Sequence, residues 1–330
     1  MENLSEKTIC RRLRKGIHLY TMGLRACCSN VCGPVYSELK NISDIDWDKI
    51  VQIRQDLIRQ FEGGEIPSCC EGCPDAAGIK SFQDIKSNGY NNNKIDLIQI
   101  NNFYACNSSC IYCVNKADMD FETKKKPRYA ILPILKDLEK RNILENKMDV
   151  LLTGGEPTCL SDIDKILKFF RKYDCTYHIF TSGIDYKKDF EKLFKENRVI
   201  MILSLDSGCM ETYKKIKQVD KFDKIIKNLQ QYIKKSPSAV NQIRMKYIFL
   251  EGINDNKEEI EKFLNLVRNL GIRNVEISID YQKKYADSKY PVPVHFNELL
   301  VFFRSYAEKL RLNIITTARI RMIFETGNII

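Results

Sequence analysis

The stretch 95–113, IDLIQINNFYACNSSCIYC, joins a strongly apolar run to three closely spaced cysteines. Its first part, 95–103, is mostly apolar on both faces, which is typical of a strand buried in a parallel sheet. Cys106, Cys110 and Cys113 follow at once, and thiolates are the usual ligands of iron–sulfur clusters. Structural zinc normally takes four protein ligands, and no fourth lies nearby. The stretch predicts a strand that ends at an iron–sulfur site, with zinc or buried free thiols as the alternatives.

Strand-like runs and helical patterns alternate through the rest of the chain. Strands covered by helices on both faces predict a parallel sheet. Six such units predict an α/β fold, a partial (β/α)6 TIM-like barrel, with its chemistry at the C-terminal ends of the strands. A helix near 295–310 and a short strand near 313–317 close the chain. The five further strand-like runs are 149–153, 177–181, 199–205, 244–250 and 275–279.

The first 90 residues form a small Cys-rich region that we expect to be mainly helical. One amphipathic helix is predicted there, beginning near Asp46 and ending at Gly63. The polar segment 87–93 indicates a linker. We therefore predict a Cys-rich region at 1–90, a barrel at 91–285, and a helix and strand at 286–330 that complete it.

Two groups of cysteines in this N-terminal region could provide a second metal site. Clustered cysteines in a large chain without an export signal bind metal more often than they form disulfides. We predict an auxiliary iron–sulfur cluster held by four of these six residues, with structural zinc or no metal as alternatives. The six are Cys27, Cys28, Cys32, Cys69, Cys70 and Cys73.

The C-x3-C-x2-C spacing, with Tyr112 before the last cysteine, resembles the signature of the radical S-adenosylmethionine (SAM) superfamily. Further motifs follow in the same order as in that family, each at the end of a predicted strand. The combination is much more specific than any one of its parts. The similar segments are Gly154-Gly155-Glu156-Pro157, Thr181-Ser182-Gly183, Ser204-Leu205-Asp206-Ser207-Gly208 and Gly252-Ile253-Asn254-Asp255.

This resemblance implies an enzyme that needs SAM and a four-iron, four-sulfur (4Fe–4S) cluster. Reductive cleavage of SAM would give a 5′-deoxyadenosyl radical that abstracts hydrogen from a substrate C–H bond, with the cofactor supplying the chemistry. Gly154 and Gly155 would let backbone approach the cofactor, and Glu156 would pair with the methionine ammonium. The remaining implied contacts are Tyr112 with adenine, Ser182, Ser204 and Asp206 with ribose or the methionine carboxylate, and Lys246 with that carboxylate.

The N-terminal region is similar to the auxiliary-cluster domains called SPASM and twitch, although those usually follow the barrel. A second cluster there would relay an electron or anchor substrate. Cys159 and Cys209 are candidate hydrogen-atom donors to a product radical, as in epimerising members of the family. The alternative for each is an ordinary buried small side chain.

Charge and hydropathy limit the partners of the chain. The formal net charge of +10 permits an anionic partner without selecting one. No long apolar run or signal-peptide pattern occurs, so we expect a cytoplasmic protein without a membrane span. The expected partners are SAM, an electron donor such as flavodoxin or ferredoxin, and a peptide or sugar substrate, with nucleic acid not expected. Peptide modification is favoured over carbohydrate or nucleotide-sugar chemistry. A noncatalytic iron–sulfur carrier and a zinc-stabilised nucleic-acid binder are the alternatives from other classes.

Overall fold

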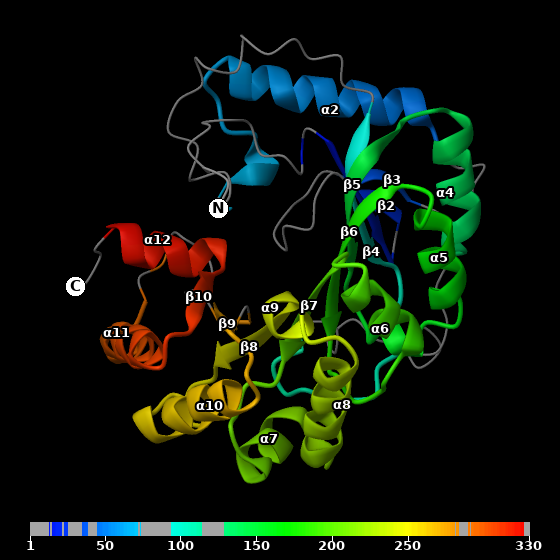
Figure 1. Ribbon diagram of the computed structural model, residues 1–330. Helices are drawn as coiled ribbons and strands as arrows, with labels where there is room; N and C mark the ends of the chain where they lie inside the picture. Colours follow the sequence, from blue (N-terminus) through cyan, green and yellow to red (C-terminus); the bar gives the residue numbers. More distant parts are fainter. Residues whose placement is uncertain are drawn as a thin grey trace. The chain divides into compact units, whose positions relative to one another are not determined.

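Backbone contacts divide the chain into two compact units. Unit 1 comprises Met1–Tyr104, Phe121–Gly154 and Asp162–Cys175, and unit 2 comprises Ala105–Asp120, Gly155–Ser161 and Thr176–Ile330. Figure 1 shows the computed structural model. The residues that it describes are 13, 15–21, 23–25, 35–38, 45–71, 73, 94–113, 129–280, 282–283, 290 and 292–326.

Unit 1 is built on five strands in the order β5-β4-β1-β2-β3. The strands β1, β4 and β5 run parallel, and β2 and β3 continue the sheet in antiparallel fashion. The strands are β1 (Gly16–Tyr20), β2 (Gly23–Arg25), β3 (Val35–Glu38), β4 (Ile95–Asn101) and β5 (Leu144–Leu152). The helices are α2 (Trp47–Glu62), α4 (Ile131–Lys140) and α5 (Ile163–Phe170), with a short η2 (Ser68–Cys70).

The helix α2 confirms the N-terminal helix predicted from sequence. Asp46 caps it, because its side chain accepts a hydrogen bond from the Lys49 amide at 2.9 Å, and Gly63 follows its last turn. Trp47 donates from Nε1 to Asp137 of α4 at 2.6 Å. Arg54, only 4% exposed, donates to the carbonyl of Gly16 in β1 at 2.8 Å. These contacts fasten α2 to the strands and helices of unit 1.

The strand β1 was not expected from sequence, and it pairs with β4, the first predicted strand. Its five residues, GIHLY, and the three of β2 are too short to show a clear period of two. The N-terminal region thus contributes strands as well as a helix to unit 1. The three-part division at residues 90 and 285 stays a prediction.

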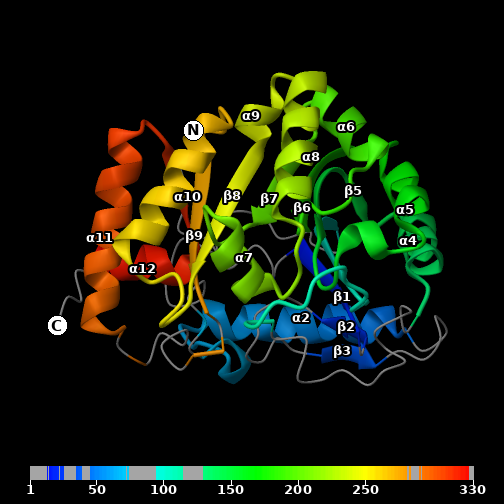
Figure 2. The ribbon, with the colours of Figure 1, turned by 90° about the horizontal axis from the view of Figure 1, so that it is seen from below.

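Unit 2 contains parallel strands in the order β6-β7-β8-β9-β10, with helices between them. The helices α10 and α11 pack side by side (Figure 2). The strands are β6 (Asp174–Thr181, begun in unit 1), β7 (Val199–Ser204), β8 (Ile243–Phe249), β9 (Asn274–Ile279) and β10 (Asn313–Thr316). The helices are α6 (Lys188–Lys195), α7 (Met210–Lys217), α8 (Phe222–Lys235), α9 (Ala239–Gln242), α10 (Lys257–Asn269), α11 (Val294–Lys309) and α12 (Ala318–Thr326).

The predicted β/α alternation is confirmed, and the fold is α/β with parallel strands, as in a partial TIM-like barrel. Buried aromatic rings cover one face of β8, where Tyr247 packs against Phe263 of α10 and Phe303 of α11. In the part of the chain that the structure describes, no helix is long and apolar enough to span a membrane.

Candidate functional site

The three predicted cluster ligands lie on one short loop that follows β4. Cys106 is exposed, and Cys110 and Cys113 are partly buried. The hydroxyl of Ser108 lies 3.4 Å from Cys106 Sγ and 3.5 Å from Cys110 Sγ. The amide of Cys113 donates to the carbonyl of Cys110 at 3.2 Å, which closes a turn. The loop therefore gathers its thiols at the C-terminal end of the first predicted barrel strand.

The thiols of this loop lie among negative charges. Among the described residues, no group of three or more Cys, His, Asp or Glu side chains is placed to hold a metal ion. The pKa of Cys106 is raised, mainly by desolvation and also by the negative charges of Glu156 and Cys110. Hydrogen bonds with Ser108 offset part of this rise. A cationic iron core would offset that repulsion and favour the thiolate.

The Gly-Gly-Glu-Pro turn follows β5 and adjoins the cysteine loop. Gly154 has φ +99°, and a Cβ there would lie 2.0 Å from Asn101 Oδ1, so no other residue fits without a shift. The Glu156 amide donates to the carbonyl of Ala105 at 2.8 Å, directly before Cys106. Pro157 begins the short helix η5 (Pro157–Cys159).

The side chain of Glu156 points into the protein and is 2% exposed. Its Oε1 accepts hydrogen bonds from Thr181 Oγ1 at 2.7 Å and from Thr158 Oγ1 at 2.9 Å. Its Oε2 accepts one from the Ser182 amide at 2.7 Å. Glu156 thus ties the turn to the end of β6. Its expected pairing with the methionine ammonium stays a prediction, because a carboxylate oxygen can accept a second hydrogen bond.

Ser182 reaches the cysteine loop through an asparagine that the sequence analysis did not single out. Its hydroxyl donates to Asn107 Oδ1 at 2.9 Å, and Asn107 Nδ2 donates to Asp185 at 2.8 Å. The predicted cofactor residue Ser182 thus lies next to the residue that follows Cys106.

Ser204 and Lys246 are neighbours in one row across the sheet of unit 2, and Glu276 of β9 is next in that row. Lys246 Nζ lies 3.2 Å from Glu276 Oε1. Arg244 lies two residues before Lys246 on β8 and so on the same face of the strand. Its Nη1 is 3.9 Å from Glu276 Oε2, and desolvation lowers the pKa of the guanidinium. This face, opposite the one that α10 and α11 cover, sets two cations against one carboxylate. Arg244 and Glu276 were missed, because charged residues in a strand give no local signal of a shared face.

Tyr112 and Asp206 meet, although 94 residues separate them in sequence. The Tyr112 hydroxyl donates to Asp206 Oδ2 at 2.6 Å, and the Ile248 amide donates to Asp206 Oδ1 at 2.8 Å. Asp206 is 0% exposed. The expected contact of its carboxylate with ribose or the methionine carboxylate stays a prediction. Lys217, a residue that the sequence analysis missed, completes the cluster of polar groups.

The two candidate hydrogen-atom donors lie in different surroundings. Cys159 is exposed, and desolvation with the nearby charges of Glu156 and Cys106 raises its pKa to about 11. Cys209 Sγ lies 3.8 Å from a carboxylate oxygen of Glu259 in α10. That contact places Cys209 beside a covering helix. The donor role of Cys159 and of Cys209 stays a prediction.

Only one of the two N-terminal cysteine groups is described. Cys69 and Cys70 lie at the end of η2 with their sulfurs 3.9 Å apart, and the Cys73 amide donates to the carbonyl of Cys70. Cys27, Cys28 and Cys32 lie outside the described residues. The auxiliary site therefore stays a prediction.

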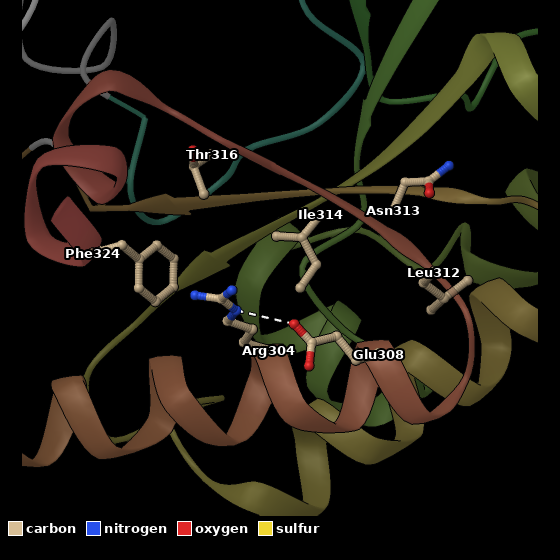
Figure 3. A pocket seen from close by; sticks show the side chains of 7 residues that line it. All are labelled: Arg304, Glu308, Leu312, Asn313, Ile314, Thr316 and Phe324. Atoms are coloured by element: carbon tan, nitrogen blue, oxygen red, sulfur yellow. Dashed lines mark hydrogen bonds and ion pairs between the residues drawn. The ribbon is translucent and has the colours of Figure 1, made fainter. Parts of the chain in front are cut away.

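A pocket of about 380 Å³ lies apart from these residues, between α11, β10 and α12 (Figure 3). Arg304 Nε donates to Glu308 Oε1 at 3.0 Å along its wall. No predicted site residue lines it. The remaining lining residues are Leu312, Asn313, Ile314, Thr316 and Phe324.

Residues 100–267 match the family model described as the radical SAM superfamily. The chain belongs to the radical SAM superfamily. It is an enzyme of that superfamily, which implies a 4Fe–4S cluster and SAM. The matched region contains the cysteine loop and each strand-end motif that the sequence analysis identified.

Two curated radical SAM relatives are named GTP 3′,8-cyclase. The chain is 28% identical over 187 residues to that of Nautilia profundicola, covering 54% of each chain. It is 28% identical over 215 residues to that of Petrotoga mobilis, covering 63% of this chain and 64% of the relative. The chain thus spans little more than half the length of the relatives it matches.

Crystal structures of Streptococcus suis SuiB show a similar fold. SuiB bound to S-adenosylmethionine is 18% identical, with a TM-score of 0.52 over 68% of this chain and 51% of SuiB. SuiB bound to the precursor peptide SuiA is 16% identical, with a TM-score of 0.54 over 86% of this chain and 57% of SuiB. This likeness supports the partial barrel.

Proposed function

We propose that the protein cleaves S-adenosylmethionine reductively and abstracts hydrogen from a substrate C–H bond. The observation that carries the proposal is the hydrogen bond from Glu156 to Ala105, which holds the Gly-Gly-Glu-Pro turn against the cysteine loop. The cluster and SAM, when bound, supply the electron and the 5′-deoxyadenosyl radical. Cys106, Cys110 and Cys113 would hold the cluster, and Gly154 lets the turn approach Asn101 at the end of β4.

Anaerobic reconstitution with iron and sulfide tests this proposal. The reconstituted protein should release 5′-deoxyadenosine from SAM when a strong reductant is added. A variant with alanine at Cys106, Cys110 and Cys113 should release none, whereas Cys175→Ala, at a buried lone cysteine, should remain active. Protein with a full iron content that forms no 5′-deoxyadenosine would refute the proposal. The same metal analysis separates a zinc-stabilised protein, which would contain zinc in place of iron.

We favour a peptide or protein as the substrate. The support is the likeness in fold to SuiB, whose structures include a complex with the precursor peptide SuiA. Incubation with deuterated peptides should place deuterium in 5′-deoxyadenosine, which mass spectrometry detects. Deuterium transfer from no peptide, but from a nucleotide or sugar phosphate, would reverse the preference.

A nucleotide or nucleotide-sugar is the second candidate, and one structural observation favours it. Arg244 and Lys246 lie on one face of β8 beside Glu276, and two cations at this spacing are suited to bind phosphate. The relatives named GTP 3′,8-cyclase also point to a nucleotide. An Arg244→Gln variant should then bind the nucleotide at least tenfold more weakly, while Arg304→Gln at the remote pocket should not. Equal binding by both variants would exclude this candidate.

The auxiliary cluster belongs to the same proposal. Four of Cys27, Cys28, Cys32, Cys69, Cys70 and Cys73 would hold it in the N-terminal region. Alanine at all three loop cysteines should leave this second cluster in place, and alanine at Cys69, Cys70 and Cys73 should remove only it. An iron count of zero in the loop variant would argue against a second site. We place the protein in the reducing cytoplasm, with flavodoxin or ferredoxin as its electron donor.

A further inference from the structure

One side chain of the cysteine loop and two from elsewhere in unit 2 form a buried polar cluster. Lys217 and Asp206 are 3% and 0% exposed and lie 2.5 Å apart, between Nζ and Oδ2. The Tyr112 hydroxyl accepts a hydrogen bond from Lys217 Nζ at 2.5 Å and donates to Asp206 Oδ2 at 2.6 Å. We call these three residues the Lys–Asp–Tyr cluster.

The Lys–Asp–Tyr cluster is costly to bury, so its stability depends on complete pairing. Removing two charges from water costs several kcal/mol per ion, which mutual attraction repays only when further hydrogen bonds are made. Asp206 meets this condition through the Ile248 amide at 2.8 Å. Asn254 Nδ2 adds hydrogen bonds to the carbonyls of Asp206 and Ile248 at 2.8 and 2.9 Å. The ion pair is therefore fixed to the end of β8.

The Lys–Asp–Tyr cluster is also joined to the cysteine loop by backbone. The Ser109 amide donates to the carbonyl of Lys217, and the Ile111 amide donates to that of Ile216, each at 3.0 Å. Tyr112 itself stands between Cys110 and Cys113 in the sequence. The backbone of the last turn of α7 is thus hydrogen-bonded to the cysteine loop on either side of Cys110. The side chain of Lys217 contacts the loop again at Tyr112.

The Lys217 ammonium also acts on the thiolates through its charge. Burial alone would lower its pKa, but attraction to Asp206 and to Cys110, with a weaker contribution from Cys106, raises it. Lys217 is therefore a buried cation, and its carbonyl accepts a hydrogen bond from the Ser109 amide, one residue before Cys110. Nearby charge and hydrogen bonding set the reduction potential of an iron–sulfur cluster. A fixed cation favours the reduced state, which carries one more negative charge.

We infer that Lys217 is a positioning residue that holds the cysteine loop through Tyr112 and Asp206, and that its charge raises the reduction potential of the cluster. This inference rests on the proposed function, because it presupposes a cluster on the cysteine loop. It assigns Asp206 to support of the loop, in place of a contact with the cofactor.

The test is an anaerobic redox titration of the reconstituted protein, followed by electron paramagnetic resonance of the reduced cluster. Lys217→Met should lower the ratio of reduced to oxidised cluster at fixed potential at least tenfold, which is about 59 mV for a one-electron couple. Lys217→Arg should restore most of that loss, because it keeps the charge. Lys214→Met is the matched control, since it removes an exposed lysine of the same helix that pairs with the exposed Asp220. It should leave the titration unchanged.

A second measurement separates positioning from charge. Tyr112→Phe keeps the ring and the ion pair but loses the hydroxyl, so iron should pass to a chelator several-fold faster than from the wild type. This variant also decides the matter if circular dichroism shows that Lys217→Met does not fold. A wild-type reduction potential in Lys217→Met, or wild-type iron release in Tyr112→Phe, would overturn this inference. Neither result would count against the proposal that the protein cleaves SAM. A wild-type protein that binds no cluster would overturn both proposals.

Discussion

Replacement of Glu156 by glutamine should destabilise the protein, although the two side chains have nearly the same shape. The carboxylate accepts two hydrogen bonds of 2.7 Å on different oxygens, one from Thr181 Oγ1 and one from the Ser182 amide. Glutamine keeps one oxygen and turns the other into a donor, which must then face a backbone N–H, that of Ser182 on one side or that of Thr158 at 3.2 Å on the other. A hydrogen bond to a charged group contributes about 1.5–3 kcal/mol, and Glu156 is 2% exposed. We expect Glu156→Gln to lower the free energy of unfolding by about 2–3 kcal/mol.

Urea unfolding of the metal-free protein, followed by circular dichroism, measures this change. Glu258→Gln is the control, because that side chain is 77% exposed and pairs with Lys262 across one helical turn. It should leave the stability nearly unchanged, as is usual for an exposed ion pair. Equal stability of Glu156→Gln and Glu258→Gln would show that the buried carboxylate is not the tie that the geometry indicates.

Three further changes have defined outcomes. Gly154→Ala places a Cβ 2.0 Å from Asn101 at φ +99°, so it should lower the melting temperature and weaken SAM binding in calorimetry. Wild-type values for both would contradict the close approach of Gly154 to Asn101. Hydrogen bonds and charge from Asn107 and Lys224 outweigh burial and lower the pKa of Asp185 from its ordinary 3.8. Its stabilising effect is therefore present above about pH 4 and lost as pH falls through the lowered value, so Asp185→Asn should flatten the acid limb of the stability–pH curve, and an unchanged limb would refute this. Arg54→Met breaks a buried hydrogen bond to a carbonyl of β1, which should cost about 1–3 kcal/mol in urea unfolding, whereas a neutral result would show that this bond does not hold α2 in place.

The sequence by itself predicted the elements whose signals are local. Apolar runs located the strands from β4 to β10 to within a few residues at most ends, and Asp46 and Gly63 marked the ends of α2. The cysteine spacing and the motifs at strand ends identified the superfamily before any geometry was known. Such signals succeed because the period of a strand, a helix cap and a short ligand loop each depend on neighbouring residues.

Other local signals leave the start of a helix open by a residue. The helix α5 begins after Asp162, which follows Ser161, and α10 is capped by Asn256, which follows Asp255. Several capping residues stand together at each start, and only the backbone angles decide which one caps. The strand β1 was missed, because its place beside β4 is a pairing over long sequence distance.

Only the tertiary structure decided which side chains meet. Lys217 stands in a lysine-rich last turn that is typical of a solvated helix end. It nevertheless lies on the buried face of α7, four residues after the fully buried Tyr213. Its partners stand 11 and 105 residues away, so no periodicity could have paired them. The direction of the Glu156 side chain was equally hidden from the motif that contains it. Charges adopt these positions because desolvation leaves each of them stable only beside a partner, and the fold alone brings those partners together.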